Sequence, residues 1–330
     1  MDGNTPGRGV RLEERWVPFP TSISAEARRN LAAMIGPDGR PAPQPTIAPD
    51  DHDGWTRAKA FVRESLVRRY APQVTGSTRV STVELGGAVV HVATPEAPYP
   101  DDRAYLELHG GALVYGEGEA CRLRAMLAAE QHGVTAYAVD YRMPPEHPYP
   151  AALDDCLGAY AALLETYAPE NIVVGGASAG GNLAAALALR ARDEGLPLPA
   201  ALVLLTPELD LTESGDSFET NQLLDVVLAY RLTDTIALYA REHDLTHPYL
   251  SPLFGDFEPG FPRTFVQAGT RDLFLSNAVR MHRALRRASV PVELHVSEGM
   301  PHGGFMGAPE DDELRDEVQR FVGQAWGRPD

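Results

Sequence analysis

From residue 104 to the end of the chain, short apolar runs alternate with longer segments that have helical periodicity. Such alternation predicts parallel strands joined by crossover helices, because a right-handed crossover returns the chain to the same edge of the sheet. We therefore expect an α/β fold, a mostly parallel sheet with helices on both faces. The expected strands are 104–109, 134–140, 171–176, 200–207, 263–269 and 291–298, and the expected helices include 120–133, 151–167, 276–289 and 311–326.

Two parts of the chain depart from this rhythm. Residues 80–96 form two β-rich runs around Gly86 and Gly87, which predicts an antiparallel hairpin at one edge of the sheet. Residues 211–259 contain helical runs and no strand, so we expect an insertion above the sheet. The first 75 residues carry a short helix capped by Ser24, a proline-rich connector and a second helix. We therefore expect helical cap residues at 1–75 and a main α/β domain at 76–330.

Composition excludes several classes of partner. The net charge of −17 argues against nucleic acid and anionic membrane surfaces, which repel an acidic protein. Neither an N-terminal signal pattern nor a long apolar run is present, so a cytoplasmic protein is expected. Cys121 and Cys156 are expected to be reduced thiols, since two cysteines build no disulfide framework. With no H-E-x-x-H or paired Cys/His spacing, no metal or cofactor is expected.

The segment Gly176-Ala177-Ser178-Ala179-Gly180 has the pattern G-x-S-x-G, between an apolar strand and a helix. This setting predicts a sharp turn that raises Ser178 out of the sheet, at the N-terminus of a helix. Free N–H groups and the helix dipole favour negative charge there. The alternative is a glycine-rich helix start with a capping serine. The strand–turn–helix context favours a nucleophile.

A serine nucleophile needs a base and an orienting acid. Ligand sites in such sheets lie beyond the carboxyl ends of the strands, so candidates are sought there. Asp272 follows one expected strand and His302 follows the next, with glycines behind it. Asp210 is a rival acid, since it also follows a strand. We prefer Asp272, because its strand neighbours that of His302 in sequence.

Acyl transfer also requires N–H donors for the developing oxyanion. The segment His109–Ala112 reads "HGGA" and follows the strand 104–109, where glycines allow close approach of the backbone. Gly110, Gly111 and Ala112 are therefore candidate donors. Ala179, just after the serine, is the expected donor on the other side.

These motifs resemble the hormone-sensitive-lipase family of α/β-hydrolases, the bacterial family IV esterases. The similarity extends from about residue 106 to 306, and "DYRMPPEHPYPAALDD" at 140–155 is its most specific segment. The resemblance implies Ser178 as nucleophile, Asp272 as acid and His302 as base, with no cofactor, often a homodimer, and helical caps. Ala112 stands where the family usually has a third glycine, and Ala177 where it usually has Asp or Thr.

The resulting hypothesis is a serine carboxylester hydrolase (EC 3.1.1.-) that cleaves small to medium hydrophobic esters through an acyl-enzyme. A lactone, which is an internal ester, is a further candidate substrate. Two alternatives remain open. One is a non-catalytic, receptor-like homologue that only binds a ligand, against which the presence of His302 argues. The other is an amidase, which the same residues permit.

Overall fold

The computed structural model describes residues 10, 13, 15–44, 46–76, 78–98 and 102–328. Its centre is an eight-stranded sheet with the order β1-β2-β4-β3-β5-β6-β7-β8. β1 and β2 pair antiparallel, as do β2 and β4, and all other neighbours are parallel. The strands are β1 (Thr78–Leu85), β2 (Ala88–Pro95), β3 (Ala104–Leu108), β4 (Thr135–Val139), β5 (Ile172–Ala177), β6 (Ala201–Leu205), β7 (Arg263–Gly269) and β8 (Val292–Ser297).

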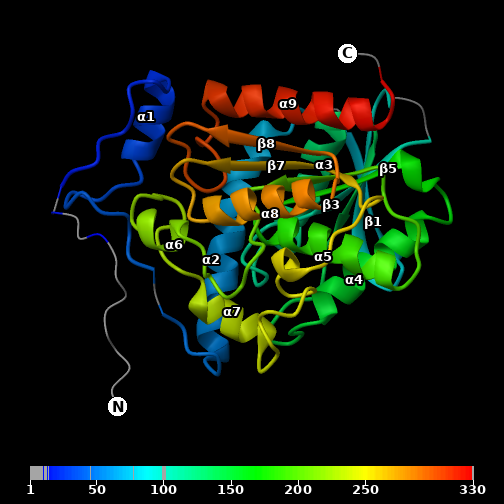
Figure 1. Ribbon diagram of the computed structural model, residues 1–330, viewed down its shortest axis with the longest axis horizontal. Helices are drawn as coiled ribbons and strands as arrows, with labels where there is room; N and C mark the ends of the chain where they lie inside the picture. The colour runs from blue at the N-terminus through cyan, green and yellow to red at the C-terminus, as the bar shows by residue number, and fades with distance from the viewer. Residues whose placement is uncertain are drawn as a thin grey trace.

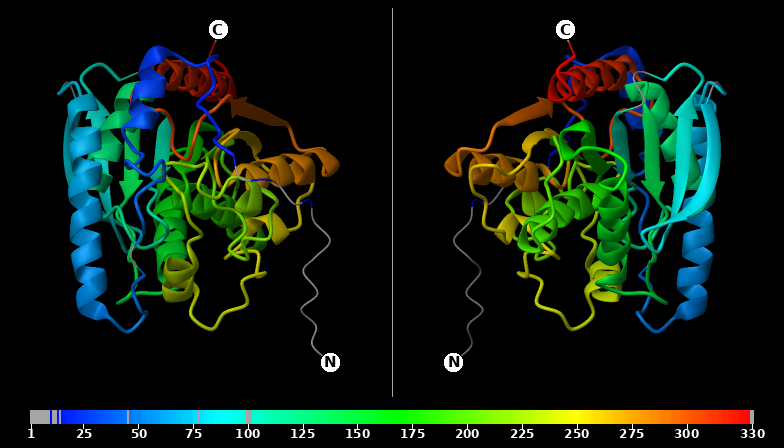
Figure 2. Two further views of the ribbon diagram at one scale, coloured as in Figure 1. Left: turned by 90° about the vertical axis from the view of Figure 1, so that its left-hand side faces the viewer. Right: turned by 90° about the vertical axis from the view of Figure 1, so that its right-hand side faces the viewer.

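Helices cover both faces of the sheet (Figures 1 and 2). α3 and α9 pack on one face, and α4, α5 and α8 pack on the other. The α-helices are α1 (Ala25–Ala32), α2 (His52–Tyr70), α3 (Glu119–His132), α4 (Ala151–Leu163), α5 (Ala179–Asp193), α6 (Ser217–Thr220), α7 (Thr233–Ala240), α8 (Leu275–Arg287) and α9 (Pro309–Ala325); short 3₁₀ turns occupy Ala71–Gln73, Pro169–Asn171 and Pro252–Phe254.

Each face of the sheet contributes its own apolar core. Alternate residues of the strands point to opposite faces, so Leu106 and Val174 join the core under α4 and α5, whereas Tyr105 and Val173 join that under α3 and α9. The central strands are buried on both faces, which explains why they read as continuous apolar runs. The expected α/β fold, with its mostly parallel sheet and edge hairpin, is confirmed.

The N-terminal segment packs against the end of the chain. Ser24 caps α1, as expected, by accepting a hydrogen bond from the Ala27 N–H, and its own N–H and hydroxyl donate to Glu310 on α9. Leu31 is fully buried in a cluster that contains Met300 and Phe305, on either side of the His302 loop. α1 thus supports the loop that carries the expected base.

In the sequence, Trp55 and Phe61 belong to one apolar stripe of α2, which predicts that both side chains are buried. Trp55 is buried against Val114 and against Leu238 in the last turn of α7, but Phe61 is 68% exposed. The expectation was wrong for Phe61, because helical spacing identifies a face without saying whether anything covers it. The insertion contains α6 and α7 and no strand, as expected, and no helix in the described residues is long and apolar enough to span a bilayer.

Leu31→Ala tests whether α1 is an integral part of the fold. Loss of a fully buried leucine should lower the free energy of unfolding by about 2–5 kcal/mol, measured by urea denaturation. Phe61→Ala is the matched control on exposed helix surface, where changes usually stay within about 0.5 kcal/mol. Equal effects of the two substitutions would contradict the packing role of α1.

Candidate active site

Ser178 occupies a tight turn between β5 and α5. Its backbone is in the left-handed region (φ 57°, ψ −120°), which is strained for a residue with a side chain. The turn requires glycine behind it, since a Cβ on Gly180 would lie 1.8 Å from the carbonyl oxygen of Leu108. Ser178 is half-buried at the N-terminus of α5, as the sequence predicted. The helix dipole there favours a developing negative charge.

The structure brings Asp272 and His302 together from the loops after β7 and β8. His302 Nδ1 lies 3.1 Å from Asp272 Oδ1, and Asp272 is fully buried. The same carboxylate oxygen accepts the N–H of Phe274 at 2.9 Å. Burial lowers the pKa of His302, but the charge and hydrogen bond of Asp272, together with the Asp225 charge, outweigh it, so the pKa is raised.

Asp210, the rival acid, is held elsewhere. Its Oδ2 accepts from Arg280 Nη1 at 2.6 Å and from the hydroxyl of Ser214 at 2.7 Å. Thr212 donates to the other oxygen. With both oxygens occupied in this way, Asp210 forms a buried ion pair beside α8 and does not contact His302.

The loop after β3 passes close to the serine. A Cβ on Gly110 would lie 2.7 Å from the Ala177 carbonyl oxygen and 3.4 Å from Ser178 Cβ. In the described chain, the backbone N–H groups of Gly110, Gly111, Ala112 and Ala179 donate no hydrogen bond within the protein. These four groups are therefore not engaged as donors within the protein, and of the loop residues it is Gly110 whose backbone lies close to Ser178.

Ala112 has a φ of 50°, in the left-handed region. Glycine enters this region without strain, which gives a physical reason for the glycine usual at this position in the resembled family. Alanine keeps the backbone N–H but adds a methyl group and conformational strain. The departure therefore changes the local backbone strain and leaves the N–H donor intact.

Ser178 and His302 are not joined by a hydrogen bond in the described structure. Catalytic hydrogen bonds are often long in unliganded proteins and tighten when substrate binds. Ser178 directly follows β5, and His302 lies in the loop after β8. β5 and β8 belong to the parallel part of the sheet and end at the same edge, toward which the arrowheads of β7 and β8 point in Figure 1. The structure thus places the expected nucleophile and base at the same edge of the sheet.

Asp225, in the insertion, is a site residue that the sequence analysis missed. Its fully buried carboxylate accepts from the N–H groups of Leu273 (2.9 Å) and His302 (3.1 Å) through one oxygen. The other oxygen accepts from the N–H groups of Val227 and Leu228. Burial, followed by the Asp272 charge, raises the pKa of Asp225. This side chain ties the acid loop, the base loop and the insertion together.

Glu208 is a second buried carboxyl group near the elbow. Its N–H donates to the Ser178 carbonyl oxygen at 3.2 Å, and its side chain is almost fully buried. Burial, with a smaller contribution from Glu213, raises its pKa to about 8. Glu208 is therefore mainly protonated at neutral pH and adds little charge beside the serine.

Segments from the N-terminal region and the loop after β3 border this edge of the sheet. Arg69 of α2 donates to the carbonyl oxygen of Gly303, next to His302, at 2.8 Å. At the other end of α2, the Trp55 ring lies 6.4 Å from that of Tyr115, which follows the Gly110–Ala112 loop. α2 therefore contacts both the loop that carries His302 and the loop that contains Gly110–Ala112.

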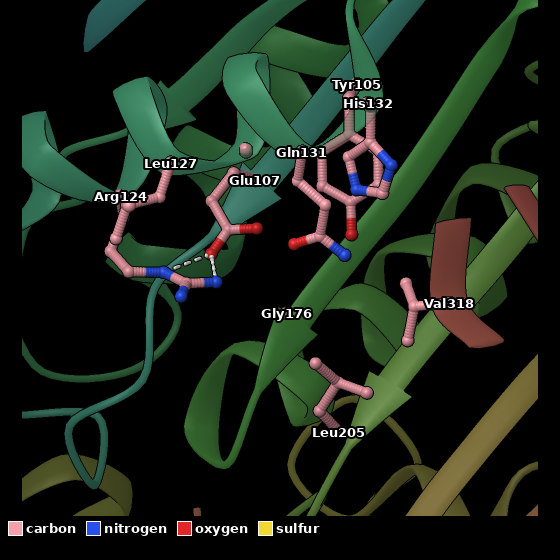
Figure 3. A pocket seen from close by; sticks show the side chains of 10 residues that line it. Tyr105, Glu107, Arg124, Leu127, Gln131, His132, Gly176, Leu205 and Val318 are labelled. Carbon is pink, nitrogen blue, oxygen red and sulfur yellow. Dashed lines mark hydrogen bonds and ion pairs between the residues drawn. The ribbon is translucent and has the colours of Figure 1, made fainter. Parts of the chain in front are cut away.

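A small cavity lies elsewhere, between β3, α3 and α9 (Figure 3). Its volume of about 20 Å³ is enough for one water molecule. Arg124 pairs with the buried Glu107 in its wall, and Tyr105 stacks on His132. The cavity is too small for an ester and is part of the packing under α3.

The strand order and the serine turn after β5 define an α/β-hydrolase. A family model described as alpha/beta hydrolase fold matches residues 105–306. The chain therefore belongs to the α/β-hydrolase family, among the hormone-sensitive-lipase-like esterases.

Individual relatives agree with this assignment. An esterase of Acinetobacter venetianus is 34% identical over 59% of this chain and 65% of its own length, so the chain spans just under two thirds of that relative. The crystal structure of an esterase, E25, is 33% identical, covers 96% of this chain and 98% of its own, and has a TM-score of 0.86. An esterase from the bacterial hormone-sensitive lipase family has a TM-score of 0.79 at 28% identity, over 92% and 99% of the two chains.

The raised pKa of His302 predicts the pH dependence of activity. A base must be neutral, so kcat/KM should fall as pH drops through a value above the ordinary histidine pKa of about 6.5. Asp272→Asn should move this midpoint to lower pH and reduce kcat by roughly 10⁴-fold. Asp210→Asn is the control and should leave the midpoint in place. A wild-type midpoint below 6, or the reverse response of the two variants, would contradict the assignment.

Asp225→Asn tests whether the Asp225 carboxylate holds the loop of Asp272 and the loop of His302 together. Asparagine keeps the shape but offers one acceptor oxygen, so two backbone donors lose their partner, at a cost of about 1–3 kcal/mol in unfolding free energy. Loss of the charge should also lower the pKa of His302 and shift the acidic limb of kcat/KM to lower pH. Asp216→Asn, on exposed surface of the insertion, is the control. A lowered stability with an unmoved pH profile would show that Asp225 is structural only.

Proposed function

We propose that this protein is a serine carboxylester hydrolase that acts through an acyl-enzyme. The observation that carries the proposal is the hydrogen bond between Asp272 and His302 at the sheet edge that also presents Ser178. A histidine oriented by a buried carboxylate is the base that a serine nucleophile requires. The esterase relatives support the same reaction class.

In this mechanism, His302 Nε2 removes the Ser178 proton while Oγ attacks the ester carbonyl carbon. The oxyanion accepts hydrogen bonds from the N–H groups of Ala179 and of the Gly110–Ala112 loop, which are otherwise unused. His302 then returns the proton to the departing alcohol. Water, activated by the same histidine, hydrolyses the acyl-enzyme. Asp272 keeps the proton of the neutral ring on Nδ1 and stabilises the charged ring in each step.

We propose small to medium hydrophobic esters as substrates. In this proposal the Ala112 methyl group takes up space at the acyl site, which favours compact acyl groups. In this proposal, residues 1–75 and 211–259 form the cap above the 76–330 domain and set the selectivity. The contacts of Arg69 and Trp55 around the site support a lid role for α2. A homodimer in the cytoplasm is part of the same proposal and rests on resemblance and composition.

Lactones remain candidate substrates, because their opening uses the same steps. An amidase needs the same residues, and a substrate panel separates the two activities. A receptor-like role would not require the Asp272–His302 bond, which aligns a proton acceptor. That bond favours the enzyme over the binding protein.

Ser178→Ala is the decisive experiment. We expect it to lower hydrolysis of p-nitrophenyl acetate by about 10⁴- to 10⁶-fold. Ser81→Ala, on the exposed side of β1, should leave activity unchanged. An organophosphate should label the wild type once, at Ser178, as seen by peptide mass spectrometry. Covalent labelling at another serine, or full activity in Ser178→Ala, would refute the proposal.

A panel from acetate to octanoate esters, with lactones and anilides, then defines the substrate class. Preference for the shorter esters would support compact acyl groups. Faster hydrolysis of octanoate would contradict that part of the proposal, and faster cleavage of anilides would favour the amidase.

A further inference from the structure

Three potential metal ligands that are distant in sequence meet between α3 and the sheet. His91 lies on β2, Cys121 in the first turn of α3, and Asp140 directly after β4. Each offers one ligand atom, and these atoms all lie within 4.8 Å of one another. The cluster is separate from Ser178, Asp272 and His302, and the proposed function does not use it.

One ring nitrogen of His91, Nε2, faces the other two ligand atoms of the cluster. His91 is 7% exposed, and its Nε2 is buried without a hydrogen-bond partner. Nδ1 lies 2.9 Å from the hydroxyl oxygen of Thr82, which accepts the N–H when Nδ1 carries the proton. That tautomer leaves a lone pair on Nε2, directed into the cluster. Metal-binding histidines are usually held by such a hydrogen bond from the second ring nitrogen.

The distance between His91 and Asp140 fits two ligands of one tetrahedral ion. Nε2 of His91 lies 3.4 Å from Asp140 Oδ2, longer than a good hydrogen bond but within ion-pair range. Two ligands bound to one zinc ion at about 2.0–2.2 Å lie roughly 3.3–3.5 Å apart. The Asp140 carboxylate is fixed by the N–H of Gly118, 3.1 Å from both oxygens.

We propose that His91, Cys121 and Asp140 form a binding site for a divalent transition metal of the zinc type. A nitrogen, a sulfur and an oxygen ligand favour such a cation over Mg²⁺ or Ca²⁺, which prefer oxygen alone. Binding releases the thiol proton, so a thiolate and a carboxylate together balance the two positive charges. Water completes the tetrahedron from the side of Asp140, the more exposed partner of the His91–Asp140 pair.

The bound ion would join β2, β4 and the beginning of α3. α3 begins directly after the loop that contains Gly110, Gly111 and Ala112. A metal at this position therefore anchors the end of that loop to the sheet. We infer a structural site, since no ligand atom of the cluster belongs to the Ser178–Asp272–His302 group.

Cobalt(II) is the probe that tests this site. Protein freed of metal by chelator is titrated with CoCl₂, without added thiols, and followed by absorption. We expect a near-ultraviolet sulfur-to-cobalt charge-transfer band that saturates at one equivalent and disappears when zinc is added. Zinc should also raise the melting temperature of the wild type. Absence of the band in the folded wild type overturns the proposal.

Variants identify the ligands. Cys121→Ala should abolish the band, whereas Cys156→Ala, which removes the other buried cysteine, should retain it. Thr82 is exposed, so Thr82→Val tests the second contact of His91 without disturbing the core, and it should weaken cobalt binding by about 10- to 100-fold. If Cys121→Ala does not fold, His91→Gln serves as the test in its place. The charge-transfer band should be lost in that variant as well. A band that survives in Cys121→Ala or in His91→Gln, or is lost in Cys156→Ala, overturns the assignment.

Discussion

The close approach of two backbones at the Ser178 turn is the constraint on which the site depends. A Cβ at Gly180 would overlap the Leu108 carbonyl oxygen, so the first turn of α5 can lie there only with glycine at position 180. This contact sets the end of β5 against the loop that follows β3. Backbone packing thereby brings the serine turn and the Gly110 backbone together. The strained φ of Ser178 persists because the buried elements on both sides determine it.

The second half of the site depends on the insertion. Asp225 binds the backbone of both Leu273 and His302, so a segment outside the sheet sets the distance between the acid and base loops. Its buried charge, near that of Asp272, also favours the protonated histidine. A region expected to act as a cover therefore belongs to the electrostatics of the site. This arrangement links the insertion to the basicity of His302.

The sequence alone was sufficient to predict the sheet, the Ser178 turn and the pairing of Asp272 with His302. Those features follow from local periodicity and from the rule that parallel strands end at one edge of the sheet. Asp225 could not be found in this way, because its partners lie 48 and 77 residues away in irregular loops. The sequence feature that could have pointed to Asp225 is a charged residue within the apolar run "LLDVVL". The exposure of Phe61 was missed for a related reason, since periodicity does not reveal what packs on a helix.

The contact between α1 and the His302 loop has a consequence for synthesis of the chain on the ribosome. Ser24 and Glu310, which are 286 residues apart, share two hydrogen bonds, and Leu31 packs in the same cluster as Phe305. Helix α1 is translated well before residues 300–310, so these partners do not yet exist when it is made. Until they leave the exit tunnel, the part of α1 that packs on Phe305 stays uncovered. A segment that is made early in translation is therefore fixed in place late.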